Sequence, residues 1–76
     1  MKFKVGDIWR TYDNRLCKIT KIDTTQTYPV FGKINDIEYN IHNIEFTENG
    51  HFIHGQPHSL DLIEKLDPNE YPEYYV

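Results

Sequence analysis

The sequence predicts a small all-β domain, and three observations lead to that prediction. Apolar and polar residues alternate with a period of two over short runs, which is the pattern of a half-buried strand. Turn-forming pairs such as Asp-Asn and Asn-Gly separate these runs. Aromatic residues make up 14% of the 76-residue chain, so a few large rings close a thin core. The pattern is typical of a small barrel or a strongly bent antiparallel sheet of about five strands.

The expected strands follow one another with a short turn between each pair. Asp13-Asn14 tolerates positive φ, so a two-residue type I′ turn is expected after the first strand. Asn35-Asp36 and Asn49-Gly50 mark two later turns. Pro29 belongs near a strand start or on an edge of the sheet, because it has no N–H to donate. Five ranges alternate as strands do: 8–12, 16–22, 27–34, 37–46 and 51–54.

Two of the later segments are less regular. Apolar positions change parity after Ile41, which predicts a bulge around His42-Asn43. Residues 59–66 fit either a strand or a short C-terminal helical turn, because Leu62 and Leu66 also lie four residues apart. We expect an SH3-like barrel first. An edge-paired homodimer is the alternative assembly, because an open sheet leaves two edges exposed.

Residues 1–66 are expected to form the single domain, with residues 67–76 as an acidic, tyrosine-rich tail. The N-terminus lacks the apolar run of a signal peptide, and no apolar stretch approaches the length of a membrane helix. Cys17 is the single cysteine and is expected in the core, so nothing indicates an oxidising compartment. A cytoplasmic protein without membrane association is therefore expected.

Charge is unevenly distributed along the chain, although the total is −4. Residues 1–22 carry six basic and two acidic residues, whereas residues 61–76 carry five acidic residues and one lysine. Such a chain either presents one face to anions and another to a basic surface, or neutralises its two ends within the fold.

Catalytic and metal-binding patterns are weak. The candidate nucleophiles Ser59 and Cys17 lie in no recognised motif, and the four glycines are dispersed, so no phosphate loop is predicted. We expect a non-enzymatic protein without a cofactor. A zinc-stabilised module is a lesser alternative, because alternation places His51 and His54 on opposite strand faces; the other candidate ligands are His42, His58 and Cys17.

The basic N-terminal hairpin is the predicted ligand-binding region. Cations beside aromatic rings suit a nucleotide or a similar anion, with the cations on phosphates and a ring under a base. The residues predicted to do this are Trp9, Arg10, Tyr12, Arg15 and Lys18. Binding of nucleic acid is less favoured, because the sequence pI of about 5.4 is acidic.

The C-terminal tail is the predicted partner-binding region. Tyrosines bring large contact area with few rotatable bonds, and the acidic residues add charge. The predicted contacts are Glu70, Tyr71, Glu73, Tyr74 and Tyr75. The alternative is that one or two tyrosines fold back over the core.

Short motifs between residues 9 and 63 resemble a group of small proteins encoded by bacteriophages and prophages. That group has a W-x-T-x-D-G-R hairpin, a Tyr-Pro-Val strand, a Thr-Glu-Asp-Gly hairpin and a closing Asp-Leu-Ile. This chain has Asn14 in place of the usual turn glycine and Asn49 in place of the usual aspartate. The resemblance implies a compact β fold in a phage-like setting, with no assigned activity or active site.

We therefore expect a binding protein, a phage accessory protein that engages a host macromolecule as an inhibitor or adaptor. A host protein is the favoured partner. The alternative is a homo-oligomer that sequesters a nucleotide or a similar anionic small molecule.

Overall fold

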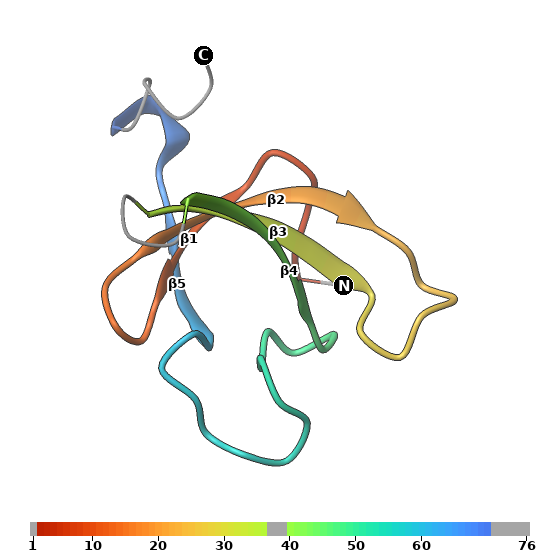
Figure 1. The fold of residues 1–76 in the computed structure, drawn as a ribbon. Coiled ribbons are helices and arrows are strands. Elements are labelled where there is room, and N and C mark those ends of the chain that lie inside the picture. Colours follow the sequence, from red (N-terminus) through yellow and green to blue (C-terminus); the bar gives the residue numbers. More distant parts are fainter. Residues whose placement is uncertain (1, 37–39, 71–76) are drawn as a thin grey trace.

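The computed structural model describes residues 2–36 and 40–70. Within these ranges the chain forms a five-stranded antiparallel sheet in the order β4-β3-β2-β1-β5, strongly bent around its inner face (Figure 1). A short 3-10 helix, η1 (Pro68–Glu70), follows the last strand. The predicted all-β, bent antiparallel sheet is confirmed. The strands are β1 (Ile8–Thr11), β2 (Leu16–Ile22), β3 (Val30–Asp36), β4 (Asn40–Phe46) and β5 (Leu62–Leu66).

Strands β1 to β4 form a meander, whereas β5 returns to pair with β1. The segment 47–61 therefore crosses from one edge of the sheet to the other. In the described part of the chain β4 and β5 remain the two edges, so the sheet is open and not a closed barrel. Within the same ranges, no helix has the length and apolar character needed to span a membrane.

The first hairpin has a three-residue loop, so the predicted two-residue type I′ turn is wrong. The N–H of Asn14 donates to the carbonyl of Thr11 (2.9 Å), and the N–H of Thr11 donates to the carbonyl of Arg15 (2.8 Å). Only Asn14 has positive φ (68°) among the described non-glycine residues. Thr11 Oγ1 accepts the N–H of Arg15 at 2.9 Å, which stabilises this wider loop.

Residues 47–51 repeat the same turn. The N–H of Gly50 donates to the carbonyl of Thr47, and the N–H of Thr47 donates to the carbonyl of His51, both at 2.9 Å. Thr47 Oγ1 accepts the N–H of His51 at 3.1 Å. Gly50, with φ of 89°, occupies the position that Asn14 has in the first turn. Both threonines are buried, so each turn is fixed from inside the domain.

Three other strand predictions are corrected. Residues 51–54 form no strand and contribute only an isolated bridge from Ile53 to Gln56. The third strand begins at Val30, where a start at residue 27 was expected, and it continues through 35–36, where a turn was expected. The segment 59–66, for which strand and helical turn were both left open, supplies the fifth strand. Residues 37–39 of the predicted fourth strand lie outside the described residues.

The predicted bulge around His42-Asn43 is also wrong, because the β3–β4 register is continuous from Val30–Phe46 to Asp36–Asn40. The irregularities lie between Arg10 and Thr11 against β5, and between Ile19 and Lys21 against β3. Bulges increase local twist and bend, so these positions help to curve the sheet.

Most of the core lies on the inner face of the sheet, whereas Ile8, which is paired with Lys18, is buried on the other face. As predicted, Cys17 of β2 is buried in the core, and Ile19, two residues further on, is fully buried on the same face. Pro29 immediately precedes β3, as its missing N–H requires. The buried core cluster comprises Phe3, Trp9, Cys17, Ile19, Val30, Ile34, Phe46 and Leu62.

Gly32 of β3 is required by close packing. A Cβ at this position would overlap Sγ of Cys17 and would lie 3.2 Å from the ring of Phe46. Burial is the larger of two effects on the Cys17 thiol, and it raises the pKa of that thiol to about 12. Cys17 therefore behaves as a small apolar residue that fills the space left by Gly32.

Gly32→Ala should lower the free energy of unfolding by about 1–3 kcal/mol, because the added methyl overpacks the core. Adding Cys17→Ala to this variant should recover at least about 1 kcal/mol, because the second change removes the overlapping sulfur. Urea denaturation of the two single variants and the double variant measures this coupling. Simple additivity would show that the two side chains do not compete for the same space.

The two matching turns should respond differently to substitution. Asn14→Gly should change the free energy of unfolding by only a few tenths of a kcal/mol, because both residues accept positive φ. Gly50→Ala should cost about 2 kcal/mol or more, because its Cβ would lie 2.6 Å from Cζ of Phe3. Thermal denaturation of both variants distinguishes them, and equal losses would contradict this account of the turns.

Candidate functional site

The structure places the predicted ligand-binding residues on different surfaces. Trp9 points inward, packs against Phe3 with ring centroids 4.5 Å apart, and is only 7% exposed. Arg10 lies on the outer face, 3.6 Å from Glu64 of β5. Lys18 shares that outer face, because it is paired with Ile8 in register while Trp9 is paired with Cys17. Trp9 is therefore separated from the cations by the sheet itself.

The remaining two predicted residues lie at the first turn. Arg15 Nε is 3.0 Å from Asp13 Oδ2, so the turn itself neutralises this cation. The side chain of Tyr12 is exposed. Anion binding by the five predicted residues stays a prediction, and the geometry does not gather them into one pocket.

The predicted partner-binding tail is described only at its start. Glu70 ends η1 and is exposed. Its N–H donates to the carbonyl of Asp67 at 3.0 Å. The other predicted contacts, Tyr71, Glu73, Tyr74 and Tyr75, lie outside the described residues. A role for these four residues stays a prediction.

The histidines of the 51–58 segment have structural partners. The Nδ1 atom of His51 lies 3.2 Å from Asp61 Oδ2, and His58 Nδ1 accepts the N–H of Leu60 at 3.0 Å. The N–H of His54 donates to the hydroxyl of Tyr28 at 3.1 Å. Among the residues that the structure describes, no three His, Cys, Asp or Glu side chains are grouped as a metal site.

Asp61 is the polar centre of the crossing segment. Its Oδ1 accepts the N–H of Phe52 at 2.9 Å, and its Oδ2 accepts the N–H of His58 at 3.1 Å. Burial is the largest single effect on this carboxyl and opposes ionisation. The two N–H donors together with the His51 ring outweigh it, so the pKa of Asp61 is lowered from its ordinary value.

The lowered pKa of Asp61 predicts a loss of stability in acid. A carboxyl whose pKa is lower in the folded state stabilises the fold fully above its unfolded pKa, and this contribution disappears as pH falls below about 4. Asp61→Asn should cost about 2 kcal/mol at neutral pH, because the amide NH2 that replaces one carboxylate oxygen cannot accept an N–H. In this variant the free energy of unfolding should also fall less steeply as the pH is lowered. Urea denaturation between pH 6 and pH 2 measures this dependence. An unchanged pH profile would contradict the role of Asp61.

The outer face of β2 and β3 carries three lysines, which we call the lysine face: Lys18, Lys21 and Lys33. Lys18 lies directly opposite Lys33 in the β2–β3 register. Lys21 is paired with Phe31, and its ammonium group lies 5.2 Å from the centroid of that ring. Strict alternation would place Lys21 on the inner face. The bulge at Thr20 adds one residue and shifts the alternation by one position, so Lys21 lies on the outer face together with Lys18.

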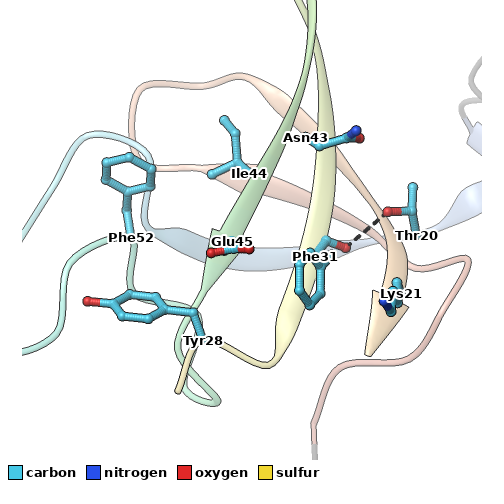
Figure 2. A pocket seen from close by; sticks show the side chains of 8 residues that line it. All are labelled: Thr20, Lys21, Tyr28, Phe31, Asn43, Ile44, Glu45 and Phe52. Atoms are coloured by element: carbon cyan, nitrogen blue, oxygen red, sulfur yellow. Dashed lines mark hydrogen bonds between the residues drawn. The ribbon is translucent and has the colours of Figure 1, made fainter. Parts of the chain in front are cut away.

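An open hollow of about 860 Å³ adjoins the lysine face and wraps around the edge strand β4 (Figure 2). Phe31, Asn43 and Lys21 line it from the outer face. Ile44 and Phe52 line it on the other side of β4, where both pack against the core. The full lining is Thr20, Lys21, Tyr28, Phe31, Asn43, Ile44, Glu45 and Phe52.

Of the three lysines in the lysine face, the sequence analysis predicted only Lys18 as a ligand contact. It predicted none of the residues that line the hollow. Alternation along β2 places Lys18 outward, but a strand pattern does not say which residue lies opposite it. Lys33 joins it only through the β2–β3 register. No family model, curated protein or solved structure matches this chain. A functional assignment therefore depends on this geometry.

Proposed function

We propose that this is a non-enzymatic binding protein whose lysine face, with Phe31, engages an acidic segment of a partner protein. The observation that carries the proposal is the placement of Lys18 directly opposite Lys33 on the outer face. This register gathers basic side chains on one surface, and such a surface attracts an acidic segment electrostatically. Lys21 extends the same positive surface along β2.

The surroundings of the lysines favour a polypeptide over a phosphate ligand. The hollow is open and of mixed chemistry, with the exposed Glu45 directly opposite Phe31. A carboxylate at this place repels a densely charged phosphate group, whereas a peptide can present an acid to the lysines and a base to Glu45. The half-buried Phe31 ring adds apolar contact area for such a segment.

A host protein as the partner, and a phage-encoded setting, belong to this proposal. They are supported by the short motifs described above and by the absence of a recognised catalytic pattern in the sequence. An inhibitor or adaptor needs only a complementary surface, which the outer face of β2 and β3 offers. The sequestering homo-oligomer remains the alternative, and a nucleotide probe separates it from the proposal.

Lys21→Glu should weaken binding of an acidic probe peptide about fivefold to tenfold, because one attraction becomes a repulsion. The probe is an extended peptide that alternates glutamate with apolar residues, and its affinity is measured by titration calorimetry at low salt. The matched control is Lys4→Glu, which makes the same change of net charge at an exposed residue outside the lysine face. Affinity should also fall as salt is added.

Three outcomes would contradict the proposal. The first is equal affinity for a peptide in which glutamine replaces glutamate. The second is an equal loss of affinity in the Lys4→Glu control. The third is a rise in melting temperature with ATP but not with the acidic peptide, which would favour the sequestering alternative.

A further inference from the structure

The two edges of the sheet differ in their chemistry. The outer positions of β5 carry Glu64 and Leu66, and Lys65 lies 3.7 Å from Asp7. Charged residues on an edge strand discourage pairing with another chain, and two of the five residues of β5 are charged. Glu45 is the one charged residue in the seven-residue strand β4, which pairs with β3 alone in the sheet order. β4 is therefore the edge more open to strand addition.

The part of β4 that lines the hollow alternates in a regular way. Ile44 is paired with Gly32 and points to the inner face, where it packs against the core. Asn43 and Glu45 are exposed on the outer face, opposite Lys33 and Phe31 respectively. A strand added to β4 would therefore place one apolar contact on the inner face and two polar contacts on the outer face.

A second copy of β4 satisfies these requirements in one antiparallel register. With a two-fold axis at Ile44, the two Ile44 side chains meet on the inner face. Asn43 of one copy then lies directly opposite Glu45 of the other, where an amide can donate to a carboxylate. Moving the axis to Glu45 would bring two carboxylates face to face, which costs stability.

The same register is complementary in charge. Lys33 lies beside Asn43 on the outer face, so Glu45 of a second copy would be two strands, or about 10 Å, from Lys33. Extended lysine and glutamate side chains span this separation between backbones. Because the axis is two-fold, the pair occurs twice. In the dimer, Glu45 of each copy would therefore pair with Lys33 of the other copy.

We propose that a second copy of this chain occupies the β4 edge, with β4 pairing antiparallel to itself about Ile44. This inference does not rest on the proposed function, because it is argued from the β4 edge and needs no partner protein. The two proposals share Lys33 and Glu45, whereas Lys21 belongs to the proposed function alone. The two are geometrically connected, however. A two-fold axis perpendicular to the sheet puts the outer faces of both copies on the same side, so the dimer would present two lysine faces to one partner.

Cysteine cross-linking tests both the pairing and its register. When Asn43→Cys and Glu45→Cys variants are mixed under mild oxidation, a disulfide should form between the two variants, because these residues are directly opposite. Neither variant alone should cross-link, because the two identical cysteines are then offset by two residues along the paired strands and are not directly opposite. Both native side chains are exposed, so the substitutions leave the core unchanged. The buried Cys17 takes no part while the domain is folded.

Ile63→Cys in β5 is the matched control, because Ile63 is 45% exposed on the opposite edge. It should give no cross-link. Cross-linking of Asn43→Cys with itself would show a different register and overturn the proposed one. Cross-linking of Ile63→Cys alone would show that β5 pairs instead.

Analytical ultracentrifugation of the unmodified chain gives the second readout. Glu45→Lys should raise the dimer dissociation constant at least about tenfold, because it places two lysines in proximity. The charge-swapped double variant Lys33→Glu/Glu45→Lys should return the dimer dissociation constant to that of the unmodified chain. A monomer at concentrations up to about 1 mM would overturn the proposal, as would a Glu45→Lys variant that associates as the unmodified chain does. The acidic-peptide titration is read separately, so the two proposals can fail independently.

Discussion

The fold depends on how a single carboxylate holds the crossing between the two edges of the sheet. Asp61 accepts N–H groups from Phe52 and His58. The backbone around it connects the two matching turns: the N–H of Tyr12 donates to the carbonyl of Asp61, and the N–H of Leu62 donates to the carbonyl of Gly50. A chain of this size has a thin core. Its long connection is therefore held by directional polar contacts in addition to the packing of Phe52 and Leu60 against the core.

The strands of the meander were largely predictable because their signals are local. Alternation identified β2, and Cys17 was expected in the core, where it is buried. Pro29 was expected near a strand start, although the predicted strand began three residues before Val30. The segment 51–66 was not predictable in the same way. Residues 51–54 have the composition of a strand, but the contacts of Asp61 hold the segment in a different path. These contacts join residues up to ten positions apart, which an alternation pattern does not record.

The candidate site shows the same division between local and long-range information. The sequence analysis grouped Trp9 with Arg10 in one ligand-binding region, but the structure places them on opposite faces of the sheet. The face that gathers cations is instead defined by register, which brings Lys33 opposite Lys18. Register is set by turn geometry and bulges, and the three-residue loop after Thr11 and the bulge at Thr20 were both unforeseen. A one-residue error in either would exchange the inner and outer faces of a strand.

The packing of Cys17 against Gly32 gives the domain a chemical reporter of its own. The single thiol of the chain is fully buried and protonated at neutral pH, so a thiol-specific reagent meets almost no reactive thiolate in the folded state. Modification requires that the core packing over the inner face opens around this position. The labelling rate of the native chain therefore measures how often the core opens, with no engineered probe.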